Sequence, residues 1–190
     1  MKYPMRRFLL TLLWANSSAF AADNLTIDAS HSAVIFSWNH FGFSNPVARL
    51  EKIQGNLALD SRDLTQSSVS VTMPLSGLRT GDADLDKRLK SDEFLDAEKY
   101  PNITFTSKQV ADAGQGALTI TGDLTVHGVT KTVVLKAKVD KIGVHPLSHA
   151  PTAGFDADTV LRRSDFGVSK YVPAMTDELF VHISLGADLR

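Results

Sequence analysis

Apolar and polar residues alternate along short segments of this chain, and this alternation constrains the fold more than any other feature. In segment 117–126, for example, Leu118, Ile120 and Leu124 fall on one face, whereas threonines and an aspartate fall on the other. Successive side chains of a β-strand point to opposite faces, so each such segment predicts a strand with one dry and one wet face. Helical periodicity is almost absent.

Turn-forming residues separate these segments and set the number of expected strands. Runs of Gly, Pro, Asn and Asp punctuate the chain between them. Eight or nine strands in one domain predict a barrel or a sandwich. The expected strands lie near 24–28, 34–41, 49–59, 68–74, 103–110, 117–126, 129–141, 153–162 and 179–189.

A helix is predicted over 83–91, because acidic residues come first there and basic residues last, as the helix dipole prefers. The segment 93–98 leaves room for a second helical turn before Pro101 returns the chain to strand. Neither internal repeats nor linkers divide the sequence, so we expect one domain over 22–190.

The first 21 residues indicate export. Three basic residues precede an apolar run at 8–14, and Ala19-Phe20-Ala21 fits an A-x-A cleavage site. This arrangement is typical of a secretory signal peptide, and the apolar run is much shorter than the roughly 20 residues of a membrane span. We therefore expect residues 1–21 to be removed and the mature protein to begin at Ala22 in the periplasm.

Composition argues against two classes of protein. Loss of the signal peptide leaves 17 basic and 21 acidic residues, a formal net charge of −4, so the basic surface typical of nucleic-acid-binding proteins is not expected. The chain has no cysteine, which excludes a disulfide framework and leaves stability to a hydrophobic core.

Two motifs admit both a structural and a ligand-binding interpretation. The dipeptide His127-Gly128 joins two β-rich runs and predicts a hairpin tip, with His127 either exposed at the turn or in contact with a ligand. His40 ends the stripe Phe36-x-Trp38-x-His40 on an otherwise apolar face. Its imidazole would either bond a polar group of a buried ligand or be satisfied by backbone.

The pair Arg162-Arg163 stands at a predicted strand end, before Ser164-Asp165. Guanidinium groups clamp phosphates through parallel hydrogen bonds, so the pair is a candidate anion site. The alternative is an internal salt bridge from Arg163 to Asp165 or to a neighbouring carboxylate. Both interpretations remain open at this point.

Residues for catalysis or metal binding do not assemble into a recognisable pattern. His145 and His149 are four apart, but Pro146 rules out the helix that would align them. The chain contains neither a G-x-S-x-G elbow nor a P-loop. We therefore expect a binding protein without a catalytic site and without a metal.

A series of motifs runs through the chain in a characteristic order. It comprises Ile27-Asp28-x-x-His31-Ser32-x-Val34-x-Phe36-x-x-x-His40, Thr80, Leu89-x-Ser91-x-x-Phe94-Leu95-Asp96, Tyr100-Pro101-x-Ile103-x-Phe105, Gly122-Asp123-Leu124-x-x-x-Gly128-Val129-Thr130-Lys131 and Ser164-Asp165-Phe166-Gly167. No single motif is specific, but the series resembles the YceI-like family over nearly all of the mature chain. That family comprises lipocalin-like, polyisoprenoid-binding proteins, many of them periplasmic.

The resemblance implies an all-β protein, an extended antiparallel eight-stranded lipocalin-like barrel with a short helical segment near 83–98. Its apolar interior would hold the tail of a long isoprenoid, such as a prenyl pyrophosphate or a ubiquinone, and no other cofactor is expected. Arg162-Arg163 and the long loop 145–151 depart from the family pattern and leave the head group open. Candidate head-group contacts are His40, Arg162 and Arg163. The inward phase of the strands assigns the tail to Phe36, Trp38, Ile103, Phe105, Leu118, Ile120, Leu124, Leu135 and Phe155.

A second hypothesis is a barrel filled by its own side chains, which serves as a stress-related or partner-binding module without lipid. Eight strands suit either a filled interior or one slender ligand, and periodicity does not choose between them. An isoprenoid lipid is the expected partner, no nucleic acid is expected, and a transient membrane contact and a homodimer are left open.

Overall fold

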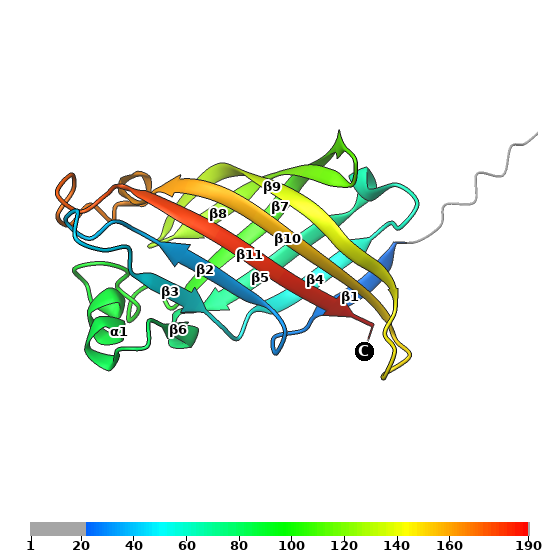
Figure 1. Ribbon diagram of the computed structural model, residues 1–190, viewed down its shortest axis with the longest axis horizontal. Coiled ribbons are helices and arrows are strands. Elements are labelled where there is room, and N and C mark those ends of the chain that lie inside the picture. Colours follow the sequence, from blue (N-terminus) through cyan, green and yellow to red (C-terminus); the bar gives the residue numbers. More distant parts are fainter. Residues whose placement is uncertain (1–21, 190) are drawn as a thin grey trace, which may run out of the picture.

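Long antiparallel strands dominate residues 22–189, the part of the chain that the computed structural model describes (Figure 1). The predicted signal peptide and Arg190 lie outside the described residues. The strands are β1 Asp23–Ile27, β2 Ala33–Ser37, β3 Val47–Leu50, β4 Gln54–Leu59, β5 Ser68–Pro74, β6 Leu78–Arg79, β7 Asn102–Gly114, β8 Ala117–Val126, β9 Val129–Val144, β10 Pro151–Arg162 and β11 Glu178–Asp188. The helix α1 spans Ala83–Lys90, and 3₁₀ turns η1 Leu64–Gln66, η2 Leu75–Gly77 and η3 Arg163–Phe166 complete the set.

Eight of the described strands close a barrel in the order β1-β4-β5-β7-β8-β9-β10-β11. The closing pair joins β11 to β1 through Thr26↔Asp188 and Ile27↔Ala187. Towards its other end β11 pairs instead with β2, from Phe180 to Ser184, and β3 and β6 extend the sheet from there. The predicted eight-stranded antiparallel barrel with one short helix is therefore confirmed.

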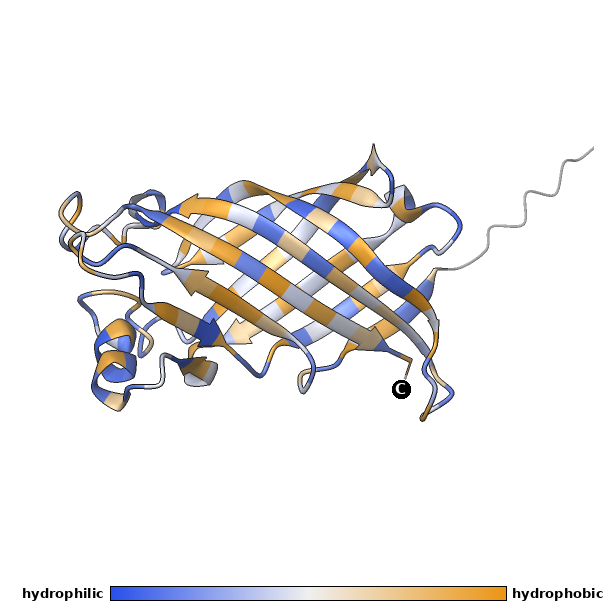
Figure 2. Cartoon of the chain, viewed as in Figure 1, coloured by the Kyte–Doolittle hydropathy of each residue, from blue (hydrophilic) through white to orange (hydrophobic). Residues whose placement is uncertain are grey.

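Apolar and polar residues alternate along the strands (Figure 2), and the apolar face of each strand forms the barrel interior. On β8, Leu118 and Leu124 are buried, and their partners include the buried Ala137 on β9, opposite Leu118, and the buried Phe105 on β7, opposite Leu124. Gly122 lies on the same face and is buried, and it has no room for a side chain: a Cβ there would lie 2.4 Å from Cζ of Phe105. Each strand thus contributes its dry face to one shared core.

Two predicted strand boundaries are wrong. The segment 49–59 is not one strand, because the backbone breaks between β3 and β4 at Lys52, which has a φ of 60°. This break lets the chain leave the sheet beside β2 and join the barrel beside β1. The strand expected to run to Phe41 ends at Ser37, because the chain turns back from His40 to Ser44.

The helix and the hairpin form as the sequence predicts. Asp82 caps α1 by accepting a 2.8 Å hydrogen bond from the backbone N–H of Leu85. The segment 93–98 forms turns and not a second helix. At the β8–β9 hairpin, His127 and Gly128 have φ values of 51° and 74°, the left-handed pair that a tight two-residue turn requires.

His127 has a structural role at this turn. Its ring packs edge-on against Tyr100 with centroids 4.9 Å apart, and it is half-buried, not solvent-exposed. The adjacent Gly128 lies so close to Tyr100 that a Cβ would stand 2.4 Å from the ring. The hairpin tip is therefore pinned to the segment that leads into β7.

Candidate functional site

An apolar cavity of about 190 Å³ occupies the barrel interior. Among the described residues that line it, the one charged side chain is Arg163. A second cavity of about 80 Å³ adjoins it, and Val69, Leu135, Ile183 and Leu185 line both. Six of the residues predicted to contact a tail line the first cavity: Phe36, Trp38, Ile103, Phe105, Leu124 and Leu135. The remaining three, Leu118, Ile120 and Phe155, line the second.

A wider pocket of about 560 Å³ opens at the end of the barrel where α1 lies, at the left of Figure 1. We call it the mouth pocket. Its polar lining includes His40, Arg88 and Tyr171. Four residues line both the mouth pocket and the barrel cavity, and we call them the neck: Trp38, Leu89, Phe94 and Met175. Mouth pocket, neck and barrel cavity therefore follow one another along a single path.

Charged groups at the mouth tie two loops together. The Nη2 of Arg88 donates to the hydroxyl of Tyr171 at 2.9 Å and lies 3.8 Å from a carboxylate oxygen of Glu93. Lys170 donates to the other oxygen of Glu93 at 3.0 Å. This hydrogen bond and the accompanying charge lower the pKa of Glu93 and raise the pKa of Lys170. The turn after α1 is thereby joined to the loop 167–177.

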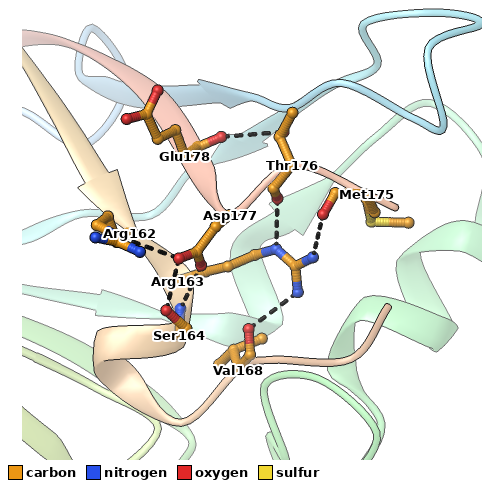
Figure 3. A network of polar contacts seen from close by, with 8 residues as sticks. All are labelled: Arg162, Arg163, Ser164, Val168, Met175, Thr176, Asp177 and Glu178. Carbon is orange, nitrogen blue, oxygen red and sulfur yellow. Dashed lines mark hydrogen bonds and ion pairs between the residues drawn. The ribbon is translucent and has the colours of Figure 1, made fainter. Parts of the chain in front are cut away.

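The buried Arg163 organises that loop from within (Figure 3). Its Nε donates to the carbonyl of Thr176 at 2.8 Å, and its Nη2 to that of Met175 at 3.0 Å. Its Nη1 donates to the carbonyls of Val168 and Lys170 at 3.0 and 2.8 Å. Burial lowers the pKa of this guanidinium. Four of its five N–H groups are engaged by backbone, so it serves as a bracket for the loop.

The ion pair that the sequence suggested for Arg163 is formed by the neighbouring Arg162, with Asp177 as its partner. The Nε of Arg162 lies 3.1 Å from Asp177, which also accepts from the backbone N–H and the hydroxyl of Ser164 at 2.9 and 2.7 Å (Figure 3). Burial raises the pKa of Asp177, but the hydrogen bonds from Ser164 and Arg162 outweigh it and the pKa is lowered. The salt bridge is thus formed by Arg162 and not by Arg163, whose donors meet backbone carbonyls. Head-group contact by either arginine stays a prediction.

His40 lies outside the apolar stripe in which the sequence placed it. Its side chain is exposed, lines the mouth pocket and packs edge-on against Phe41 with centroids 4.7 Å apart. The stripe ends at Trp38, because the chain turns immediately afterwards. Head-group contact by His40 stays a prediction, and the side chain lies in the mouth pocket, at the outer end of the apolar path.

Sequence reasoning missed much of the mouth. Leu85 and Leu89 are one helical turn apart and both line the mouth pocket, a spacing that could have placed the neighbouring Arg88 there. Tyr171 and Met175 come from a loop without periodicity, so no pattern signalled them. The long loop 145–151 lies at the opposite end of the barrel (Figure 1), away from Arg162 and Arg163.

The fold and the site define a class of protein: a closed antiparallel barrel around an apolar path that ends in a polar mouth. A family profile described as the YceI-like domain matches residues 25–187. A UPF0312 protein of Vibrio cholerae is 33% identical over 89% of this chain and 87% of its own length. A UPF0312 protein of Shewanella denitrificans is 35% identical over 86% and 88%. The chain belongs to the YceI-like family.

Solved structures share the fold. BcnA of Burkholderia cenocepacia aligns with a TM-score of 0.76 and 24% identity, covering 84% of this chain and 98% of that one. A polyisoprenoid binding domain from Saccharophagus degradans aligns with a TM-score of 0.69 and 14% identity, covering 87% and 98%. Within residues 22–189, no helix is long and apolar enough to span a membrane.

Proposed function

We propose that this protein binds a long isoprenoid lipid, with the tail in the barrel and the head group in the mouth pocket, and carries or stores it in the periplasm. The observation that carries the proposal is the apolar path itself. Protein cores contain few voids larger than a water molecule, whereas this barrel encloses adjoining cavities of about 190 and 80 Å³. The description of the Saccharophagus neighbour as a polyisoprenoid binding domain supports the same ligand class.

Energetics indicate where such a lipid comes from. Transfer of some forty carbons from water, at about 0.8 kcal/mol per CH₂, amounts to roughly 30 kcal/mol, above the practical ceiling for affinity of about 18 to 21 kcal/mol. Water is therefore the wrong reference state. In a membrane the tail is already dry, so the barrel gains from packing and head-group contacts alone. Exchange with a membrane is the step that we expect to load and unload the protein.

The test is extraction of the purified protein with organic solvent, followed by mass spectrometry for a prenyl lipid. We expect Leu124→Trp, which places a larger ring in the barrel cavity, to abolish co-purified lipid while the barrel still melts near the wild-type temperature. A filled core would respond differently, since overpacking costs about 1–3 kcal/mol of stability.

Val134→Trp is the matched control, because Val134 is 50% exposed on the outer face of the neighbouring strand. It should leave the lipid content unchanged. Wild-type protein that never yields a lipid, together with a strongly destabilised Leu124→Trp, would instead support the filled barrel with a partner-binding or stress-related role.

A further inference from the structure

Trp38 carries a hydrogen-bond donor that the protein leaves unused. Its side chain is 6% exposed and belongs to the neck, where the barrel cavity meets the mouth pocket. Among residues 22–189, the buried Nε1–H finds no acceptor. Native proteins pair nearly all such groups, because an N–H that loses its hydration without a replacement destabilises the fold. A buried orphan donor at a cavity wall therefore indicates a missing partner.

The surroundings of Trp38 explain why no acceptor of the protein reaches it. The other neck side chains, Leu89, Phe94 and Met175, have no oxygen, and the Phe36 ring lies 6.0 Å away. The carbonyl of Met175 is taken by Arg163. A single water would be poorly held, since a buried water needs two to four polar partners.

The position of the indole is fixed by the backbone on either side. The backbone N–H of Trp38 donates to the carbonyl of Pro46 at 3.4 Å. The backbone N–H of Asn39, the next residue, donates to the Thr176 hydroxyl at 2.9 Å. The Asn39 carbonyl in turn accepts from the Thr176 N–H at 3.2 Å. The donor is therefore held at the level where the apolar path ends and the polar mouth begins.

We propose that the indole N–H of Trp38 donates a hydrogen bond to the first oxygen of the lipid head group, and that this oxygen is uncharged, as in the carbonyl of a prenylated quinone. This inference rests on the proposed lipid-binding function and specifies its head group. A tail seated in the barrel cavity brings the first head-group atom to the neck. The acceptor thus satisfies the donor that the protein leaves unpaired.

The preference for an uncharged oxygen follows from the donors nearby. A phosphate in a dry site requires several charge-assisted hydrogen bonds. Arg163, the one cation lining the barrel cavity among described residues, gives its donors to backbone carbonyls. Arg88 is engaged with Tyr171 and Glu93. One neutral N–H matches one neutral carbonyl.

The test compares Trp38→Phe with wild type, because phenylalanine keeps an apolar ring and removes the donor. Phosphatidylcholine vesicles would carry a trace of a prenylated benzoquinone, a prenyl phosphate of the same tail, or an acceptor-free prenyl hydrocarbon, and transfer to the protein would be measured. We expect Trp38→Phe to weaken quinone uptake about fivefold to tenfold more than hydrocarbon uptake, because the difference between the two isolates one hydrogen bond from the lost ring packing. Phe36→Leu, which removes packing without removing a donor, should affect both alike.

A second measurement does not depend on the variant. The indole proton of Trp38 should move downfield in a ¹⁵N–¹H spectrum of wild-type protein on addition of the quinone and stay in place with the hydrocarbon. Trp38 is the one tryptophan in residues 22–190, so the mature protein gives a single indole signal that needs no further assignment.

Equal effects of Trp38→Phe on quinone and hydrocarbon, or an unmoved indole proton, would overturn the role of Trp38. Stronger, Trp38-dependent uptake of the phosphate would overturn the uncharged acceptor. Failure of wild type to take up any of the three lipids would contradict lipid binding itself, and is thereby distinguished from both.

Discussion

Arg163 illustrates how one side chain can order a loop that no sequence pattern describes. The sequence placed this residue at a strand end as a candidate anion clamp, whereas its donors meet carbonyls of residues 168–176. Those acceptors belong to an irregular segment, so neither periodicity nor spacing could have paired them with the guanidinium. In contrast, the inward direction of Trp38 followed from alternation, although its orphan N–H did not.

Replacement of Arg163 by methionine should destabilise the protein by on the order of 3 kcal/mol, because four backbone carbonyls lose their donor in a buried site. The midpoint of urea unfolding measures the effect. Arg162→Met is the control, since that side chain is 66% exposed and its loss should change stability by less than about 1 kcal/mol. Equal effects of the two substitutions would contradict the stabilising role of the hydrogen bonds from Arg163 to the loop.

Asp177 makes stability depend on pH in the acid range. Its folded-state pKa lies below the ordinary value, so its contribution is complete above the unfolded pKa of about 4 and is lost as pH falls through the folded value. We therefore expect the melting temperature of Asp177→Asn to lie below that of wild type at neutral pH and the gap to narrow in acid. A gap that stays constant from neutral pH into acid would assign the loss to packing alone.

At the scale of elements, the strands were predictable and their junctions were not. Alternation predicted β8 and β9 because one face of each strand is apolar and the other is polar. The His127-Gly128 turn set the register between the two strands. The break at Lys52 was missed, although the alternation changes phase there, since two consecutive polar residues, Glu51 and Lys52, separate Leu50 from Ile53. Backbone breaks of this kind depend on which neighbouring strand each half joins.

Gly122 is a position where β8 approaches β7 closely. A methyl group there would meet the Phe105 ring at 2.4 Å and the Thr106 carbonyl at 2.6 Å. Gly122→Ala should therefore force β7 and β8 apart or displace the ring, and we expect a loss of about 1–3 kcal/mol in unfolding free energy and a lower lipid content.

Gly143→Ala provides the comparison, because a Cβ at that strand position meets nothing closer than Lys141 Cε at 3.9 Å. Its stability should stay within about 0.5 kcal/mol of wild type. If the two alanine variants had the same melting temperature, the close approach at Gly122 would not contribute to the free energy of unfolding.

For the whole molecule, the sequence predicted closure and an apolar interior but not the arrangement of the mouth. Closure follows when every strand has a dry face to hide. The mouth gathers α1, the turn at His40 and the loop 167–177, three segments far apart in the chain, and their meeting depends on tertiary contacts such as Arg88 to Tyr171.

Export is a property of the whole chain and remains a prediction. Cleavage after Ala21 should give a mature protein that begins at Ala22, as the A-x-A pattern indicates. N-terminal sequencing of protein recovered from the periplasmic fraction measures it. Recovery of a cytoplasmic form that retains Met1 would contradict periplasmic carriage without affecting the barrel.

The neck also has a consequence for which lipids can compete. Four large side chains form the neck between the mouth pocket and the barrel cavity, and we expect this passage to admit one hydrocarbon chain end-on. Phospholipids, the bulk of any membrane, have two chains joined at a glycerol, so the second chain of a bound phospholipid would remain in water. The restriction to one chain would thus exclude phospholipids before any head group is recognised. A less abundant single-chain lipid would remain as the occupant.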